Sequence, residues 1–263
     1  AVWFTAERPE LEVPEVTIVP LDENRGLAHA LNIGLQHCDF DVVARADCDD
    51  VSLPNRFATI IPQFTRRSAA SHTTVKSKLP IDVMGSAIRE FTDDERQPGQ
   101  IRMLPAEGAD LEKYARMQSP VHHPSVVFRK SAVLAAGGYP EDAGRFEDYL
   151  LWERMMLNHA QFLNMPEPLV LYRTNQEAYE RRGGWDMFRE ELRLQWRFLR
   201  DGFTSPAQFL RNTFIRAAYR MMPTSLRKRA YHSIVSRRNT EISAAPAPAE
   251  VQAKPRGRHA QSE

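Results

Sequence analysis

Three carboxylates stand within four residues in the stretch Ala44-Arg-Ala-Asp-Cys-Asp-Asp50, where Asp47, Asp49 and Asp50 follow an apolar segment. Acidic side chains at alternate positions of a loop aim their oxygens at one point, so their repulsion must be answered by positive charge. A hard cation such as Mg²⁺ or Mn²⁺ is held by one or two carboxylates together with substrate phosphates. The alternative is a solvated turn in which Asp50 or Ser52 caps the next helix.

A second acidic pair, Glu147-Asp148, opens the segment Asp148–His159, whose apolar residues keep helical spacing. A carboxylate at such a position can act as a general base. The alternative is an ordinary acidic first turn that interacts with the helix dipole. The residues alone leave both interpretations open, and they do not say which of the two carboxylates faces inward.

Strand-like and helix-like segments alternate around these two acidic sites. This alternation predicts an α/β fold with a largely parallel sheet, in which ligands lie beyond the carboxyl ends of the strands. The acidic loop falls at such an end. We expect strands at Val16–Leu21, Phe40–Ala46, Ile81–Phe91, Ser125–Phe128, Gln161–Met165 and Leu169–Tyr172, and helices around Leu27–Leu35, Phe57–Phe64, Leu111–Ala115, Ser131–Ala136 and Asp148–His159.

The chain changes character after the last expected strand. From about Trp185 to Ser236 only helical patterns follow, and between Arg181 and Arg238 there are 14 Lys and Arg against 4 Asp and Glu. Beyond Asn239 the composition is rich in Ala, Pro, Glu and Gln and lacks aromatic residues, which is typical of disorder. We therefore expect a catalytic domain over residues 1–175, a basic helical extension over 176–238 and a disordered tail over 239–263.

Composition narrows the class of protein. No run of about 18 apolar residues and no signal peptide is present, and the two cysteines, Cys38 and Cys48, suggest neither a disulfide framework nor a zinc site. These features favour a cytoplasmic protein. A basic nucleic-acid-binding protein would leave the acidic loop unexplained, so no nucleic acid is expected as a partner. A metal-dependent phosphohydrolase is also less favoured, since Asp50-Val51-Ser52 does not supply its usual pattern.

Five stretches, in order, resemble the family 2 glycosyltransferases, which are inverting nucleotide-sugar enzymes of the GT-A fold. The resemblance runs from about Val16 to Arg173 and is specific because the order and spacing agree as well as the motifs. The stretches are Glu23-Asn-Arg-Gly-Leu27 with Ala30-Leu-Asn-Ile-Gly34, the acidic loop Ala44–Asp50, His123-Pro-Ser-Val-Val-Phe-Arg-Lys130, Gly137-Gly-Tyr139, and Glu147-Asp148 with Trp152.

The resemblance implies roles for the acidic residues. Asp47 and Asp49 would hold Mn²⁺ or Mg²⁺ on the diphosphate of a nucleotide-sugar, with a UDP-sugar the expected donor. Asp148 would take the proton from the acceptor hydroxyl, with Glu147 as the second candidate base.

Other residues are expected around the donor and the acceptor. Asn24, Gly26 and Asn32 match the stretch that lies near the nucleotide, and Arg45 would pair with the aspartates or the donor phosphates. The alternatives are turn and cap chemistry for the first three and plain charge balance for Arg45. Donor or acceptor contact is expected from His123, Arg173, Arg181 and Arg182, with a structural histidine and solvated arginines as the alternatives.

The stretch Glu180-Arg-Arg-Gly-Gly-Trp185 and the basic helices resemble bacterial transferases that build exopolysaccharide, capsule or lipopolysaccharide side chains. Their acceptors are carried on polyprenyl diphosphate, so a lipid-linked saccharide acceptor and an anionic membrane surface are expected, at the inner face of the cell membrane. A Gln-x-x-Arg-Trp motif is absent, which favours transfer of a single sugar. Family members usually begin with a further strand, helix and strand, so a truncated, inactive transferase is the alternative.

Overall fold

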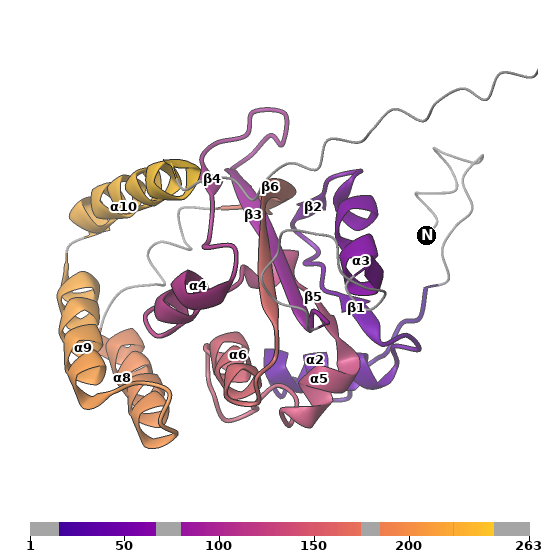
Figure 1. Cartoon of the computed structure of the whole chain (residues 1–263), viewed down its shortest axis with the longest axis horizontal. Helices are drawn as coiled ribbons and strands as arrows, with labels where there is room; N and C mark the ends of the chain where they lie inside the picture. Colours follow the sequence, from indigo (N-terminus) through magenta and orange to yellow (C-terminus); the bar gives the residue numbers. More distant parts are fainter. Residues whose placement is uncertain (1–15, 67–79, 175–184, 223, 245–263) are drawn as a thin grey trace, which may run out of the picture.

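A mixed sheet forms the centre of the molecule in a computed structural model that describes residues 16–66, 80–174, 185–222 and 224–244 (Figure 1). Its strands follow the order β1-β5-β3-β6-β2. Strand β4 is not part of this path and pairs with the last residues of β3. The strands are β1 (Val42–Ala44), β2 (Val51–Ser52), β3 (Val83–Phe91), β4 (Ile101–Arg102), β5 (Val127–Arg129) and β6 (Phe162–Arg173).

The mixed sheet flanked by helices is the architecture that the sequence predicted, but the expected predominance of parallel pairing is wrong for the described strands. Only β3 and β6 run parallel, and every other pairing among them is antiparallel. The main reason is β5, which lies antiparallel to both of its neighbours, β1 and β3. Local apolar spacing predicts a strand but carries no information about its direction.

Strand β6 merges two expected strands into one. It pairs with β3 from Val83 opposite Phe162 to Phe91 opposite Arg173, with register irregularities around Ala87. Pro166 and Pro168 lie at this irregularity, and because proline has no N–H to donate, a ladder is interrupted there. The predicted break between Met165 and Leu169 is therefore a bulge within a continuous strand.

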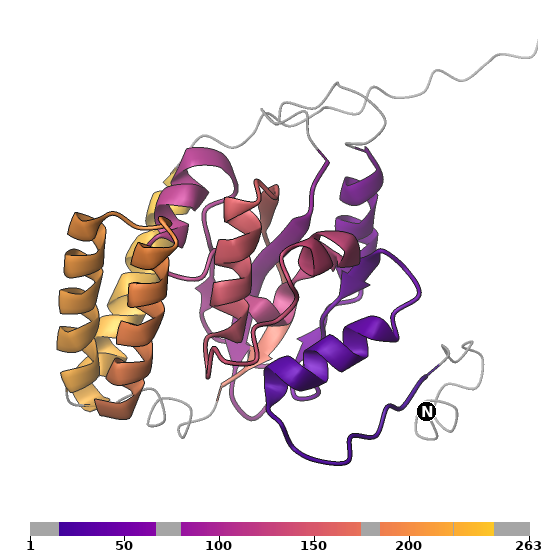
Figure 2. The ribbon, with the colours of Figure 1, turned by 90° about the horizontal axis from the view of Figure 1, so that it is seen from below.

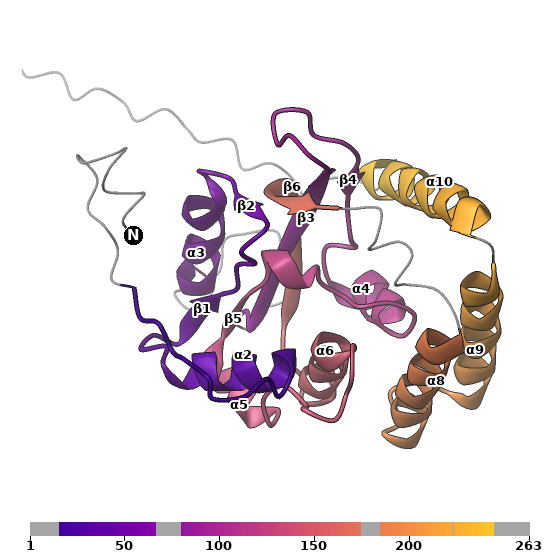
Figure 3. The same ribbon diagram turned by 180° about the vertical axis from the view of Figure 1, so that it is seen from behind.

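Helices cover both faces of the sheet, with α3 on one side and α4 and α6 on the other (Figures 1 and 3). Neighbouring residues such as Val83 and Met84 point into the two separate cores, as expected for side chains that alternate along a strand. The helices are α2 (Leu27–Gln36), α3 (Arg56–Arg66), α4 (Gly108–Ala115), α5 (Lys130–Ala135) and α6 (Glu147–Leu157).

The strand expected at Val16–Leu21 is wrong. These residues form no strand, and Ile18 is 85% exposed. In the part of the chain that the structure describes, no strand pairs with them. An apolar run becomes a strand only when a neighbouring strand forms hydrogen bonds with its N–H and C=O groups, and composition alone does not reveal such a partner.

Three helices follow the sheet: α8 (Trp185–Arg200), α9 (Pro206–Met221) and α10 (Thr224–Ala244). The start of α9 is a capping box, in which Ser205 accepts from the backbone of Gln208 and the Gln208 side chain accepts from the backbone of Ser205. Leu194, Phe198 and Phe203 pack against Ala115, Tyr149 and Leu150 of the catalytic part.

Helix α10 returns to the sheet and corrects the expected start of the disordered tail. Asn239 donates to the carbonyl of Ile101 at 2.6 Å and accepts from the backbone of Met103 at 3.2 Å, and α10 continues to Ala244. The boundary expected at residue 239 therefore lies inside a helix. No helix in the described ranges is both long and apolar enough to cross a membrane.

Candidate active site

The acidic loop joins the end of β1 to β2, and β2 pairs with the end of β6. A backbone hydrogen bond from Asp50 to the carbonyl of Asp47 closes the turn at 3.2 Å. Asp47, Asp49 and Asp50 each offer a carboxylate oxygen, and these oxygens lie within 4.8 Å of one another. The loop therefore gathers Asp47 and Asp49 at one point, as the sequence predicted, and adds Asp50, which was expected only as a cap or an outer residue.

Arg45 supplies the first positive group. Its guanidinium pairs with the carboxylate of Asp47 through two contacts, Nη1 to Oδ2 at 3.0 Å and Nη2 to Oδ1 at 2.8 Å. Such a two-bond pairing fixes the direction of the carboxylate as well as its charge. The expected pairing of Arg45 with the aspartates is thus present in the structure.

Arg56 supplies a second positive group, which the sequence reasoning missed. Its side chain is almost fully buried, and it donates to Ser52 Oγ at 2.8 Å, to the carbonyl of Arg45 at 2.8 Å and to the carbonyl of Pro124 at 3.4 Å. Burial lowers the pKa of Arg56, while Asp47 and Asp50 oppose that shift. A signal was available, because Arg56 shares the four-residue spacing of the buried Ile60 and Phe64 on α3.

Arg173, a residue expected to contact donor or acceptor, holds the loop from the end of β6. Its backbone N–H donates to Asp50 Oδ1 at 2.8 Å, and its guanidinium donates to the carbonyls of Asp49 and Thr92 and lies over the ring of Phe91. Asp50 is therefore tied to β6 and does not cap α3. Arg181 and Arg182, expected to contact the same ligands, lie outside the described residues.

The free oxygens of the loop fit a divalent cation. Asp49 is exposed, and Asp50 Oδ2 is buried with no hydrogen-bond partner in the described structure. Burial, followed by the charges of Asp47 and Asp49, raises the pKa of Asp50 to about 6, against the opposing hydrogen bond from the Arg173 N–H. Because a buried carboxylate oxygen without a donor is costly, a cation at this point would remove an existing cost.

The second acidic pair occupies the first turn of α6. Glu147 is buried, and Asp148 Oδ1 accepts from the N–H of Tyr149 at 2.7 Å while its other oxygen faces His123. Burial, followed by the charge of Glu147, raises the pKa of Asp148 to about 7. Burial also raises the pKa of Glu147. Asp148 is the more accessible of the two carboxylates, and a pKa near neutrality suits a general base.

His123 lies behind Asp148 in a pocket of aromatic rings. Its Nε2 is 3.1 Å from the Tyr139 hydroxyl, its Nδ1 is 3.9 Å from Asp148 Oδ2, and its ring meets the edge of Trp152. Burial, followed by the charge of Arg45, holds the pKa of His123 well below its usual range. The imidazole is therefore neutral and turned toward Asp148. Tyr139 is a further residue of the candidate site, which the sequence analysis named only as part of a motif and gave no role.

Asn32, from the stretch Ala30–Gly34, holds the backbone of Tyr139. Asn32 donates to the carbonyl of Tyr139 and accepts from its N–H, each at 2.8 Å. Gly138 has a φ of +73°, and a Cβ there would lie 2.9 Å from Asn32 Oδ1. Asn24 accepts from the N–H of Gly26, the residue that precedes α2, at 3.0 Å. In the structure Asn32 positions Tyr139 and Asn24 bonds the backbone turn at Gly26, and the contact of these three residues with a nucleotide stays a prediction.

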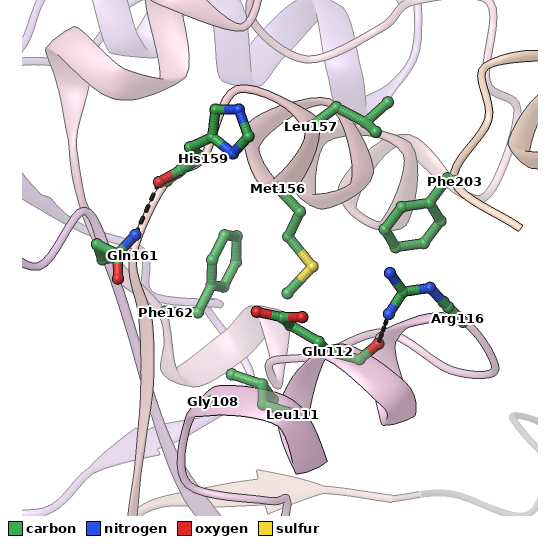
Figure 4. A pocket seen from close by; sticks show the side chains of 11 residues that line it. Gly108, Leu111, Glu112, Arg116, Met156, Leu157, His159, Gln161, Phe162 and Phe203 are labelled. Atoms are coloured by element: carbon green, nitrogen blue, oxygen red, sulfur yellow. Dashed lines mark hydrogen bonds between the residues drawn. The ribbon is translucent and has the colours of Figure 1, made fainter. Parts of the chain in front are cut away.

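A separate cavity lies at the opposite end of α6, away from Glu147 and Asp148 (Figure 4). It has a volume of about 350 Å³ and is lined by Leu111, Glu112, Arg116, Met156, His159 and Phe203, among others. None of the residues expected to bind donor, acceptor or metal lines it.

Comparison with known proteins identifies the family. The family model for Glycosyl transferase family 2 matches residues 6–132. The chain is 33% identical over 217 residues to the Escherichia coli UDP-Gal:alpha-D-GlcNAc-diphosphoundecaprenol beta-1,3-galactosyltransferase, covering 82% of this chain and 74% of that protein. The chain belongs to glycosyltransferase family 2.

Two further proteins resemble the chain. The Erwinia amylovora amylovoran biosynthesis glycosyltransferase AmsE is 34% identical over 219 residues, covering 82% of this chain and 76% of that protein. A Pyrobaculum calidifontis mannosyltransferase, solved in complex with GDP-Man and Mn²⁺, is 17% identical with a TM-score of 0.47, covering 94% of this chain and 62% of that chain. The resemblance to family 2 glycosyltransferases inferred from five motifs is confirmed, and glycosyl transfer is the activity of the chain's family.

Proposed function

We propose that this glycosyltransferase moves one sugar, with inversion and with the help of a divalent metal, from a UDP-sugar to a lipid-linked saccharide during surface polysaccharide synthesis. The observation that carries the proposal is the position of Arg45. It pairs with Asp47 of the acidic loop, and its positive charge partly offsets the burial that raises the pKa of Glu147 and Asp148. One cation therefore influences both carboxylate groups, so a metal-bound donor and a base would act in a single site.

Asp47 and Asp49 are the proposed metal ligands, and the unpartnered Asp50 Oδ2 makes Asp50 a third candidate. Mn²⁺ or Mg²⁺, when bound, neutralises the charge that develops on a departing diphosphate. Arg45 contributes positive charge to the same end of the site. Arg173 keeps the loop attached to β6, which holds the carboxylates in place for the donor.

Asp148 is the proposed base, and Glu147 remains the second candidate. Inversion requires a base that takes the acceptor proton on the face opposite the leaving group, through a transition state with oxocarbenium character. Asp148 has one oxygen that accepts from the N–H of Tyr149 and a second oxygen 3.9 Å from His123 Nδ1, beyond hydrogen-bond distance, so the second oxygen would take the proton of an acceptor hydroxyl. Its raised pKa makes the carboxylate a stronger base than an exposed aspartate, because a proton is more stable on it.

The acceptor is proposed from the Escherichia coli relative, whose name gives a diphosphoundecaprenol-linked GlcNAc as its substrate. The relative from Erwinia amylovora is named for amylovoran, a second bacterial polysaccharide product. A polyprenyl-linked saccharide would place the reaction at the inner face of the cell membrane, with the enzyme attached peripherally.

Calorimetric titration with UDP, in the presence and absence of Mn²⁺, tests the donor half of the proposal. Metal-dependent binding that is lost in Asp49→Ala and retained in Cys48→Ser is the expected result. UDP binding that is equally tight without metal would contradict the role of the loop. Release of UDP from a series of UDP-sugars, with a short-chain prenyl diphosphate-linked GlcNAc as acceptor, then tests transfer and identifies the sugar.

A further inference from the structure

Helices α8 and α9 lie at one edge of the molecule (Figures 1 and 2). Several of their large apolar side chains are exposed. We call this set the outer face. On α8, Trp185 and Trp196 are each 59% exposed, and on α9 Leu210 is 67% and Phe214 76% exposed. The outer face consists of Trp185, Leu192 and Trp196 on α8 with Leu210, Phe214 and Met221 on α9.

Each helix presents its exposed apolar residues along one side. Spacings of 7 and 4 residues on α8, and of 4 and 7 on α9, keep each set on a single side of its helix. Trp196 also meets the ring of Phe209 at 6.1 Å between centroids, so an aromatic contact joins the apolar stripe of α8 to α9.

Polar side chains, by contrast, fill part of the interface inside the helix pair. Glu191, Gln195 and Asn212 are almost fully buried. Asn212 donates to Gln195 at 3.0 Å and to the carbonyl of Arg116 at 2.7 Å, and Glu191 binds Arg216 and Arg220. A helix pair surrounded by water places its aromatic residues inward and its charged residues outward, and this pair does so only in part.

The charge at the outer face is positive. Arg189 and Arg193 are exposed between Trp185 and Trp196, and Arg211 is exposed beside Leu210. Helix α9 contains no Asp or Glu. Of the three acidic residues of α8, Glu191 lies inside, Glu190 is partly buried near Arg145, and Asp186 is exposed next to Trp185. Several arginines of these helices are used internally, and Arg211 itself donates to Asn212, so the total charge of the segment overstates what the surface offers. Arg189 and Arg193 are the exposed arginines that flank the apolar stripe of α8.

We propose that the outer face docks on an anionic lipid bilayer, with α8 and α9 lying flat at the interface. Tryptophan rings and aliphatic side chains enter the boundary between headgroups and acyl chains, and interleaved arginines pair with anionic headgroups. An aqueous protein partner is a weaker fit, because the exposed apolar residues are spread along the length of both helices and none of them lines the cavity at the end of α6 or the one beside Gly144 and Leu194. That the bilayer also carries the acceptor rests on the proposed function, but docking of the outer face on lipid can be measured without substrate.

Sedimentation with vesicles of phosphatidylcholine alone, or with 30% phosphatidylglycerol, tests the proposal on the full chain. We expect at least about tenfold stronger partition onto the anionic vesicles, falling with salt. Trp196→Ser with Phe214→Ser should reduce partition on the anionic vesicles by about tenfold or more, and Arg189→Glu with Arg193→Glu should remove the preference for anionic lipid. Leu134→Ser with Arg96→Glu, exposed residues elsewhere, is the matched control and should leave partition unchanged.

Two results would overturn the proposal. One is equal partition of the outer-face variants and the control; the other is a concentration-dependent dimer in solution that the outer-face substitutions abolish while no vesicle binding is seen. Circular dichroism of each variant checks that the helices remain folded. UDP titration of the same samples separates this test from the proposed donor site. A protein that binds UDP normally but does not bind vesicles would refute the docking proposal and leave the proposed function intact.

Discussion

Nδ1 of His123 lies 3.9 Å from Oδ2 of Asp148, while Nε2 of the same ring lies 3.1 Å from the hydroxyl of Tyr139. The three side chains form a line that begins in the core and ends at the candidate base. When the Tyr139 hydroxyl donates to Nε2, the neutral imidazole carries its proton on Nδ1 and turns a donor toward Asp148. This arrangement orients the carboxylate without placing a second charge beside it.

Asp148→Asn should lower the rate of sugar transfer by at least about a hundredfold, because an amide cannot accept the acceptor proton. Glu147→Gln should retain most of the transfer. In the parent enzyme the pKa of Asp148 is raised to about 7, and the base acts only when ionised, so kcat/KM should rise with pH and level off above about 7. Steady-state rates from pH 5.5 to 8.5 check this. The reverse ranking of the two variants would make Glu147 the base.

Tyr139→Phe should separate positioning from binding. The substitution removes the hydroxyl that meets His123 Nε2 and leaves the ring packing intact. We expect kcat to fall about three- to tenfold with little change in KM for the UDP-sugar, and the midpoint of the pH profile to move upward, since Asp148 loses an oriented donor. An unchanged pH profile would show that the Tyr139 and His123 contact is only structural.

Asp49→Ala should abolish the effect of metal on UDP binding. Asp49 is the exposed member of the acidic loop, and its loss removes one of the three converging oxygens. Chelation of the parent enzyme with EDTA should reproduce the same loss, and added Mn²⁺ should restore binding in the parent only. Calorimetry measures all of these. Tight, metal-dependent binding by Asp49→Ala would mean that Asp47 and Asp50 suffice.

Arg56→Met should destabilise the fold more than its place at the start of a helix suggests. The guanidinium satisfies Ser52 and two backbone carbonyls, and it offsets the charge of the acidic loop. We expect the free energy of unfolding to fall by about 2–4 kcal/mol in urea denaturation. Arg96→Met, at a largely exposed side chain, is the control and should change it by less than about 0.5 kcal/mol.

Glu153→Gln should stabilise the protein above neutral pH. The Glu153 side chain is buried, neither of its oxygens has a hydrogen-bond partner in the described structure, and burial raises its pKa to about 7. A raised carboxyl pKa costs stability above pH 7, and that cost fades as pH falls toward the unfolded value. The gain should be about 1–3 kcal/mol at pH 8 and below about 1 kcal/mol at pH 5. Thermal unfolding, with the exposed Glu95→Gln as control, measures the difference.

Local sequence patterns predicted the helices and the acidic sites well. The stripe of Leu151, Trp152 and Met155 identified α6, and the acidic loop follows a strand as expected, although the short strand β2 comes between the loop and α3. These features depend on neighbours within a few residues, which the order of the chain displays directly.

Features that depend on distant partners were missed. The antiparallel direction of β5 and the absence of a strand at Val16–Leu21 are set by which strands meet in space. Arg56 was overlooked because its partners include the carbonyl of Pro124, 68 residues away. The bond between the Asn32 amide and Tyr139, 107 residues away, was likewise not anticipated. No local spacing encodes such pairs.

The return of α10 to the sheet has a consequence for the order of folding. The carbonyl of Ile101, in β4, accepts a hydrogen bond from the side-chain amide of Asn239, which is synthesised 138 residues later. Tyr231 likewise supplies a hydroxyl to the carboxylate of Glu90 at the end of β3. A growing chain can therefore assemble the sheet while one edge stays open, and α10 closes that edge as a late step. Pulse-labelled hydrogen exchange should find the amides around Met103 protected together with α10 and after those in the middle of β3.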